Sequence, residues 1–516
     1  MSNKSKPNIQ DLQHEDLAAL RGVDVSEISV PADLKENVKE LAKYEYPFRN
    51  LIFGGGGNRL FAYTGSLKVL EDVGILSNIK RLGGTSLGAL TACFIALGLT
   101  PHQLVVEVEK ARCKVEKMLL DARWGILSLI FNLKSEYGWH PANAYTKWLE
   151  DNIKDYGGHG QLTFKELYEN TGKELCCVAT NLNLMTAEYC HVKTTPDLPI
   201  IVALRMSMSL PALLCAVKHN LRGEDDIYVD GGLLCNYPIH VYDGWWLSMK
   251  EENTFFKKLR PAANIAKLYD TKERFKEKNK ETLGLCLYTE TESSLMQINF
   301  NERYCGKHAK IPDTKLARKR KDTIEKKKKC SNNRKALASS FVKFFDVIDK
   351  FDKDNSGTLS LAEFNDLFER SNTDDFTQED FRTLFGKDDI KIVFKEIDKN
   401  NSGEITTREI LNYVDTKGLH MLAEFVGYQR QTITGFGSYL MALQNSVFNH
   451  SMREYVEATD VERTVGIDTY YINGTDFAID IEDRNFLYEQ GFRATVAYLE
   501  EFVKSETLKP KKMSNK

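Results

Sequence analysis

One serine of the sequence lies between two glycines in a pattern that suits a nucleophile. Gly84, Ser86 and Gly88 form a GxSxG within the stretch GGTSLGAL. The apolar run before it predicts a strand and the residues after it predict a helix. A tight turn between a strand and a helix exposes a serine hydroxyl, and the first amides of the helix favour negative charge near that oxygen. The alternative interpretation is an ordinary buried glycine turn.

Two further segments could supply the anion-binding pocket and the base that a serine nucleophile needs. Gly54 to Gly57 follow a short apolar strand, and their N–H groups can approach a substrate oxygen. Leu60 replaces the third glycine of a GxGxxG pattern, so a nucleotide is not the expected ligand. Asp230 ends a predicted strand in YVDGGLLCNYP. Taken alone it could be a turn or capping residue, but burial could raise its pKa enough for it to act as a base.

Two twelve-residue segments match the EF-hand calcium loop, DKDNSGTLSLAE from Asp352 and DKNNSGEITTRE from Asp398. Their oxygen donors stand at the positions that calcium requires. The predicted ligands are Asp352, Asp354, Ser356, Thr358 and Glu363 in loop one, and Asp398, Asn400, Ser402, Glu404 and Glu409 in loop two. Calcium is therefore the expected cofactor, with weaker binding at loop two, which has fewer acids. Leu359 and Ile405, both at position 8, predict a short β contact between the loops. The alternative is a purely structural or buffering pair.

The elements around these residues alternate between strands and helices. A strand over 51–53, a helix over 60–70, a strand over 79–82 and a helix ending near 97 form a βαβ unit, which predicts a parallel sheet. Further strands are expected at 175–179, 227–229 and 283–288. Two helix–loop–helix units follow between about 341 and 417. A helix from Leu419 to about 447, a strand over 464–471 and an amphipathic helix from about 486 to 502 then resume the pattern. This order predicts an inserted helical module.

Composition and charge favour a folded soluble protein. Of the 516 residues, 42% are hydrophobic and 28% are charged, and the ten cysteines show no CxxC spacing, so we expect reduced thiols and a cytosolic location. The first residues lack an apolar signal core, and Ser2 stands where N-myristoylation requires glycine. Residues 310–335 carry twelve Lys or Arg against three acids. Such a block is typical of a solvated linker, with an anionic membrane, nuclear targeting or an acidic partner as alternatives.

Four motifs resemble the patatin-like phospholipase family in residue type, order and spacing. They are GGGGNRLFAYTGSLKVLEDVGI, GGTSLGAL, LRMSMSLPALL and YVDGGLLCNYPI. The resemblance runs from about residue 48 to 289 and resumes more loosely from Arg463, in RTVGIDTYYINGTDFAIDIEDRNFLYEQG. It implies an α/β fold with three layers around a mostly parallel sheet, into which the all-α EF-hand module is inserted.

The resemblance also implies a lipid acyl hydrolase with a serine–aspartate dyad. Ser86 would then be the nucleophile and Asp230 the base. Gly55, Gly56 and Gly57 would form the oxyanion hole, with Arg59 as the basic residue of the glycine motif; Leu60 departs from the small residue usual after it. A dyad needs no catalytic histidine, and His240, His308, His420 and His450 have no distinguishing sequence context.

These observations predict six segments and one leading function. The segments are a helical and polar extension (1–47), the first part of the patatin-like domain (48–308), a basic linker (309–338), the EF-hand pair (339–417), the second part of the domain (418–505) and a basic tail (506–516). The expected function is a cytoplasmic hydrolase of phospholipase A type that cleaves glycerolipid esters under calcium regulation. We expect an acyl-lipid substrate, peripheral membrane contact and no nucleic-acid partner. The alternatives are a catalytically weak or inactive calcium-sensing membrane adaptor and a neutral-lipid or lysolipid esterase.

Overall fold

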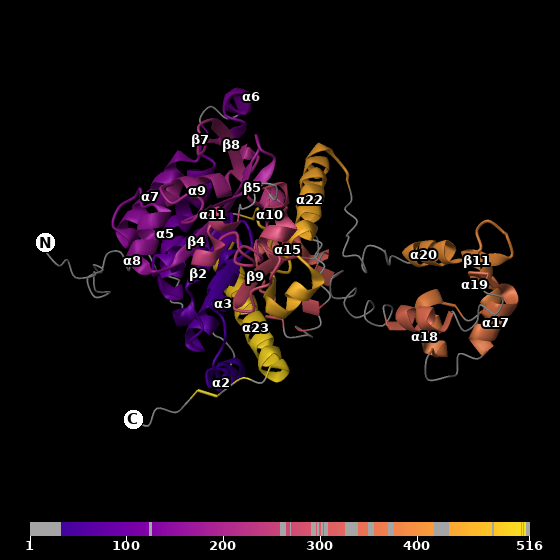
Figure 1. The fold of residues 1–516 in the computed structure, drawn as a ribbon. Helices are drawn as coiled ribbons and strands as arrows, with labels where there is room; N and C mark the ends of the chain where they lie inside the picture. The colour runs from indigo at the N-terminus through magenta and orange to yellow at the C-terminus, as the bar shows by residue number, and fades with distance from the viewer. Residues whose placement is uncertain are drawn as a thin grey trace, which may run out of the picture. The chain divides into compact units, whose positions relative to one another are not determined.

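The structure, a computed structural model, divides into two compact units (Figure 1). The sheet unit comprises residues 1–289, 295–316 and 435–516, and the helical unit comprises 290–294 and 317–434. The described residues are 32–122, 126–258, 265–268, 270–289, 296, 299–300, 303, 308–322, 324–325, 339–348, 356–369, 376–387, 389–416, 433–476, 479–506, 508 and 510–511. The helical unit thus interrupts the sheet unit in sequence.

A mixed sheet forms the centre of the sheet unit, with strand order β12-β9-β1-β2-β4-β8-β7 and β5 paired to β4. Its strands are β1 (Asn50–Phe53), β2 (Arg81–Thr85), β4 (Glu174–Asn181), β5 (Thr186–His191), β7 (Val217–Asn220), β8 (Asp225–Asp230), β9 (Thr282–Tyr288) and β12 (Thr464–Asp468). The run from β12 to β4 is parallel. The pairs β4–β5, β4–β8 and β7–β8 are antiparallel. The sheet is therefore mostly parallel, as predicted.

Helices of the sheet unit connect and cover these strands (Figure 1). They are α2 (Ala32–Leu41), α3 (Leu60–Asp72), α4 (Leu87–Ala96), α5 (Pro101–Leu119), α6 (Ile126–Ser135), α7 (Asn143–Gly157), α8 (Phe164–Thr171), α9 (Ile200–Met208), α10 (Gly232–Cys235), α11 (Phe255–Lys258), α12 (Ile265–Leu268), α13 (Thr271–Arg274), α22 (Phe436–Tyr455) and α23 (Ile481–Ser505). Two short strands, β3 (Gly138–His140) and β6 (Ala212–Leu214), pair in a separate parallel ladder. Within the described residues, 3₁₀ helices span Leu76–Asn78, Glu251–Asn253 and Ala458–Arg463, and α15 (Lys315–Lys319) lies where the two units meet in sequence.

Apolar packing on both faces of the sheet produces the three layers. Successive side chains of a strand point to opposite faces. Ile52 of β1 packs with Tyr237 and Val241 in one hydrophobic cluster. Phe53, the next residue, meets the ring of Tyr63 in α3 on the other face, with ring centroids 5.3 Å apart. The predicted three-layer α/β fold is confirmed.

The long C-terminal helix is part of this packing. Helix α23 lies along α3, and glycines make the close approach possible. A Cβ atom at Gly65 would lie 1.9 Å from the carbonyl oxygen of Tyr488, and one at Gly491 would lie 1.8 Å from that of Ala62. Residues on both sides of the helical unit therefore build one core.

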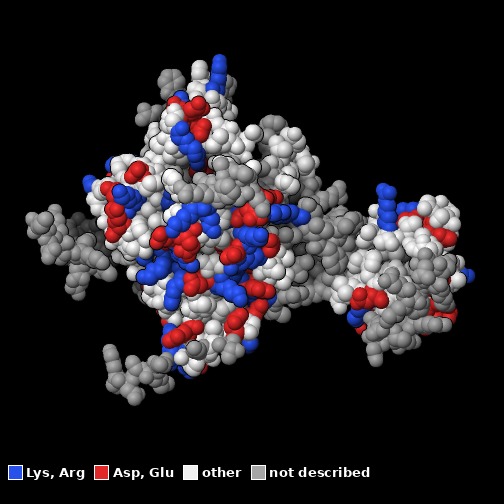
Figure 2. Space-filling view, in the orientation of Figure 1, with Lys and Arg blue, Asp and Glu red and all other residues white. Residues whose placement is uncertain are grey.

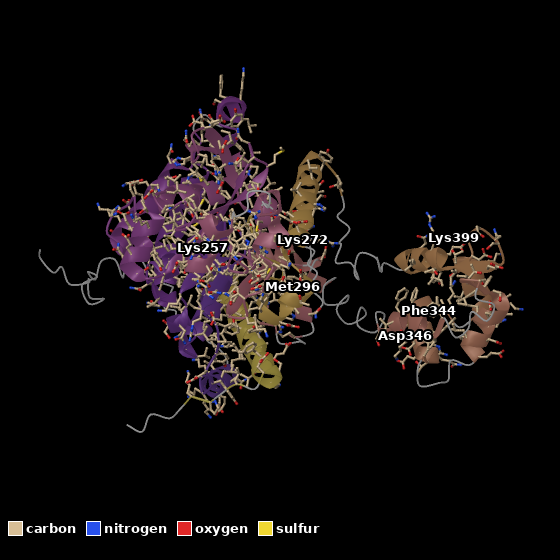
Figure 3. The ribbon with its side chains drawn as sticks, viewed as in Figure 1. Lys257, Lys272, Met296, Phe344, Asp346 and Lys399 are labelled. Atoms are coloured by element: carbon tan, nitrogen blue, oxygen red, sulfur yellow. The ribbon has the colours of Figure 1, made fainter. Side chains whose placement is uncertain are left out.

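The helical unit contains α17 (Leu361–Glu369), α18 (Gln378–Phe385), α19 (Ile390–Ile397) and α20 (Thr407–Thr416). Strands β10 (Thr358–Ser360) and β11 (Glu404–Thr406) pair antiparallel, with Leu359 opposite Ile405, so the predicted contact between the loops is confirmed. Buried side chains that include Phe344, Phe364 and Phe385 form its core; Figure 3 labels Phe344.

Several strands and helices begin or end at residues other than those predicted from the sequence. Strand β2 begins at Arg81 and includes the two glycines before Thr85, and β12 ends at Asp468. Strands β5 and β7 were not expected. The predicted helix from Leu419 lies partly outside the described residues, and its described part belongs to α22. Among the helices that the structure describes, none has the length and apolar character to cross a membrane.

Candidate active site

Ser86 occupies a sharp turn between β2 and α4. Its backbone has φ 55° and ψ −126°, a conformation that a non-glycine residue adopts only when the surrounding structure imposes it. The flanking glycines make the turn possible, since a Cβ atom at Gly84 would lie 2.4 Å from the carbonyl carbon of Gly88. One at Gly88 would lie 2.4 Å from the carbonyl oxygen of Phe53. The GxSxG segment is thus a strained turn between a strand and a helix, a geometry that can expose a serine hydroxyl for nucleophilic attack.

Asp230 is the hydrogen-bond partner of this serine. The Ser86 hydroxyl donates to Oδ2 of Asp230 at 2.7 Å, and the N–H of Gly232 donates to Oδ1 at 2.7 Å. Strand register explains the meeting, because Thr85 pairs with Val178 and Ala179 pairs with Asp230. Two residues 144 positions apart in sequence are therefore brought into direct contact.

Burial gives Asp230 the character of a base. Its side chain is 2% exposed, and burial raises its pKa to about 6, although the hydrogen bonds from Ser86 and Gly232 act in the opposite direction. A carboxylate with this pKa is mostly ionised at neutral pH and binds a proton much more readily than an exposed aspartate.

Ser207 supports the turn, and the sequence analysis gave it no role. The N–H of Ser86 donates to the Ser207 hydroxyl oxygen at 2.8 Å, and that hydroxyl donates to the carbonyl of Val178 at 2.6 Å. The carbonyl of Ser209 accepts from the N–H of Asp230 at 2.8 Å. Both serines lie in LRMSMSLPALL, so the only sequence signal for them was the family motif itself.

The glycine loop lies beside Ser86. A Cβ atom at Gly55 would lie 3.6 Å from that of Ser86 and 2.2 Å from Oδ1 of Asn236. The N–H of Gly55 donates to the carbonyl of Asn236 at 2.8 Å, so this amide is already engaged. Within the described residues, the structure records no acceptor for the N–H groups of Gly56 and Gly57. These two amides are the better candidates for an oxyanion hole.

Arg59 holds the glycine loop from within the protein. This residue is 4% exposed, and its Nε donates to the carbonyl of Gly56 at 2.8 Å. Its Nη1 donates to Oγ1 of Thr469 at 3.3 Å, and the N–H of Asn58 donates to the carbonyl of Gly474 at 2.7 Å. Residues that follow the helical unit in sequence therefore fix the shape of this loop.

Among the described histidines, none forms a hydrogen bond with Ser86 or Asp230. His240 is buried, its Nε2 lies 2.9 Å from the Tyr189 hydroxyl, and burial lowers its pKa to about 3. The ring of His240 stacks on Tyr455 of α22, with centroids 4.7 Å apart. His420 lies outside the described residues.

Comparison with known proteins identifies the domain. Residues 51–243 match the family model described as patatin-like phospholipase. The chain contains a patatin-like phospholipase domain. The match ends before β9, and β9, β12 and α23 lie in the same sheet unit as the matched residues. Residues 346–368 and 390–414 match the EF-hand model.

Three curated relatives resemble part of this chain. An uncharacterized protein of Acanthamoeba polyphaga mimivirus is 30% identical over 39% of this chain and 63% of its own length. The uncharacterized protein YqhO of Bacillus subtilis is 31% identical over 39% of this chain and 66% of its own length. A probable lipid hydrolase of invertebrate iridescent virus 6 is 26% identical over 38% and 63%. This chain thus spans just under two thirds of each relative.

The EF-hand loops present oxygen donors that fit calcium. In loop two, the Asp398 carboxylate accepts from the N–H groups of Ser402 at 3.0 Å and Gly403 at 2.9 Å. Gly403 has φ 81°, which the sharp turn at position 6 requires. Glu409 accepts from the N–H of Thr406 at 3.0 Å, and this bond is the main cause that lowers its pKa. Thr358 donates to the side chain of Glu404 at 2.8 Å.

The two loops are described to different extents. Ser356, Thr358 and Glu363 of loop one lie within the described residues, whereas Asp352 and Asp354 lie outside them. Among the described residues there is no group of three or more His, Cys, Asp or Glu placed to hold a metal ion. The donors of loop two are two acidic side chains, an amide, a hydroxyl and the Glu404 carbonyl. This set has the all-oxygen chemistry that calcium prefers.

Proposed function

We propose that this protein is a lipid acyl hydrolase of phospholipase A type. The observation that carries the proposal is the 2.7 Å hydrogen bond from the Ser86 hydroxyl to the buried carboxylate of Asp230. A serine at a strained turn, bonded to a base with a pKa of about 6, is equipped for nucleophilic attack on an ester. The probable lipid hydrolase among the relatives supports the choice of a lipid substrate.

The proposed reaction has two steps. Ser86 Oγ attacks the ester carbonyl while Asp230 takes the hydroxyl proton. The N–H groups of Gly56 and Gly57 stabilise the oxyanion, and the collapse of this intermediate releases the alcohol, to which Asp230 returns the proton. Water then attacks the acyl-serine with Asp230 again as base, which releases the fatty acid and restores the Ser86 hydroxyl.

We further propose that calcium regulates membrane contact rather than the chemistry. The proposed steps at the dyad require no metal ion, whereas the EF-hand pair has the donors that calcium needs. The basic segment over 310–335 precedes the EF-hand pair in sequence, and basic clusters bind anionic lipid. In this proposal the protein is cytoplasmic and peripheral at membranes, and calcium promotes its binding to anionic vesicles.

The decisive experiment compares the dyad variants on lipid substrates. Ser86→Ala and Asp230→Asn should each lower release of fatty acid from phosphatidylcholine vesicles at least about 1,000-fold. Ser77→Ala and Asp225→Asn are matched controls, because both residues are exposed and Asp225 is on the same strand as Asp230. Wild-type-like turnover in either dyad variant would refute the mechanism.

The substrate alternatives are distinguished in the same experiment. A parallel assay on triacylglycerol emulsion and lysophosphatidylcholine, with products identified by mass, separates a phospholipase from a neutral-lipid or lysolipid esterase. An inactive adaptor would release no fatty acid from any of the three substrates, in the presence or absence of calcium.

A further inference from the structure

Two segments of the sheet unit expose large apolar side chains. One runs from α6 to the start of β3, and the other is the turn between β4 and β5. The exposed fractions are 72%, 39% and 58% for Phe131, Leu133 and Tyr137, and 43%, 52% and 83% for Leu182, Leu184 and Met185. We call these six residues the apolar rim.

The apolar rim is connected to the edge of the sheet that carries the nucleophile. Thr85, directly before Ser86, pairs with Val178 of β4, and β4 continues in the same direction to the turn that holds Leu182. The N–H of Leu182 donates to the carbonyl of Ile227 at 2.9 Å, so this turn lies against the start of β8.

The segment from α6 to β3 is connected to the site through β6. Gly138 of β3 pairs with Ala212 of β6, and β6 begins three residues after Ser209, whose carbonyl accepts from the N–H of Asp230. Figure 1 shows α6, β7 and β8 at the same end of the sheet unit. The turn after β4 is therefore an extension of a strand beside the dyad, and the segment from α6 to β3 is linked to the dyad through β6.

The apolar rim carries almost no net charge. Between Phe131 and Tyr137 the only charged residues are Lys134 and Glu136, and the turn over 182–185 has none. By contrast, Figure 2 shows basic and acidic side chains interspersed over much of the face turned to the viewer. A neutral, strongly apolar surface gains free energy by entering lipid rather than by attracting lipid head groups.

We propose that the apolar rim inserts into a zwitterionic phospholipid surface and so brings Ser86 to the lipid ester. The proposal rests on the proposed function, since a lipid substrate gives this contact its purpose. It adds a contact separate from the basic segment, and this contact is independent of calcium and of salt.

The test measures partitioning of the full chain into phosphatidylcholine vesicles without calcium, in a Ser86→Ala background that prevents hydrolysis. Adding Phe131→Ser and Met185→Ser together should weaken partitioning about tenfold, with no dependence on sodium chloride concentration. Phe256→Ser is the matched control, because Phe256 is an aromatic residue of the sheet unit with 80% exposure that lies on α11, outside the apolar rim.

Each outcome supports or overturns the proposal. Unchanged partitioning of the double variant, or an equal loss with Phe256→Ser, would overturn it. A third outcome is a dimeric parent and a monomeric double variant that bind vesicles equally well. This outcome would show that the apolar rim is an interface between copies of the chain instead. With Ser86 intact, the double variant should hydrolyse a soluble short-chain ester at the parental rate. Failure of the proposed function is distinct, because the parent would then hydrolyse neither the ester nor the lipid.

Discussion

Asp230 acquires its chemistry from its surroundings rather than from its residue type. An exposed aspartate has a pKa near 4, and at neutral pH it would take a proton from serine poorly. At 2% exposure, burial raises the pKa of Asp230 to about 6. The cost of burying the carboxylate is thus the origin of its basicity.

The pH dependence of the reaction should report this pKa. In the proposed mechanism the ionised form of Asp230 is the base, so hydrolysis of a soluble short-chain ester should rise with pH through about 6 and level off above about 7. At pH 5 the rate should be about tenfold below the plateau. A profile of kcat/KM between pH 4.5 and 8.5 measures this, and a rate that is flat across pH 6 would exclude Asp230 as the base.

The same pKa shift predicts an opposition between stability and activity. A carboxyl group whose pKa is higher in the folded state destabilises the fold increasingly as pH rises from about 4 through 6. Asp230→Asn should therefore raise the free energy of unfolding by up to about 3 kcal/mol at pH 8, and by under about 1 kcal/mol at pH 4.

Urea denaturation can measure this difference in the sheet unit alone. All five tryptophans lie between residues 124 and 246, so their fluorescence follows unfolding of that unit. Asp225→Asn, at the exposed end of β8, should leave the unfolding free energy nearly unchanged at both pH values. A destabilised Asp230→Asn protein at pH 8 would contradict the argument.

At the scale of elements, the sequence predicts best what local pattern determines. Continuous apolar runs identified β1, β4 and β9, because strands of a parallel sheet are buried on both faces. Strand β2 was displaced in the prediction because Gly83 and Gly84 weaken its strand signal, although the register with β1 and β4 holds them in the sheet. Strands β5 and β7 gave no pattern strong enough to be recognised.

The residues of the candidate site also differ in how far local sequence patterns predict them. The calcium loops stand in short motifs whose spacing is diagnostic. Ser86 stands in a GxSxG that gains weight from the strand and helix predicted around it, and the role of Asp230 as base came from the family resemblance. The roles of Ser207 and Thr469 depend on hydrogen bonds between segments distant in sequence. No local pattern encodes such contacts, so only the fold reveals them.

Helix packing provides a test of how far the domain extends. Gly491→Ala would place a methyl group against the carbonyl of Ala62, and such overpacking costs about 1–3 kcal/mol. We expect the urea midpoint of the tryptophan signal to fall accordingly. Gly435→Ala is the control, since its Cβ would meet no atom within 4 Å. Equal stability of the two variants would show that α23 does not support the sheet unit.

At the scale of the whole molecule, one unit is inserted within another. Calcium binding to the inserted unit can be tested at single ligands of loop two. Glu409→Gln removes the charged ligand at position 12 and should weaken calcium binding to this loop about tenfold or more. Glu404→Gln is a matched control, because the residue at position 7 contributes its backbone carbonyl. The calcium affinity of this variant should be close to that of the parent.

Isothermal titration calorimetry of the full chain measures both affinities. Hydrolysis of a soluble ester should be unchanged in Glu409→Gln, since the proposed mechanism uses no calcium ion in its chemistry. A parallel loss of affinity in both variants would indicate that loop two does not bind calcium as an EF-hand.

The pairing of β9 with β12 also has a consequence during protein synthesis. Strand β12 begins roughly 175 residues after β9 ends, and ribosomes add about 5–20 residues per second. Strand β9 is therefore made about 10–35 s before the strand that covers its outer edge. During this interval the N–H and C=O groups of its outer edge are open to pairing with other chains. The inserted unit thus lengthens the period in which a newly made chain can aggregate, and conditions that slow translation should lower the yield of soluble protein.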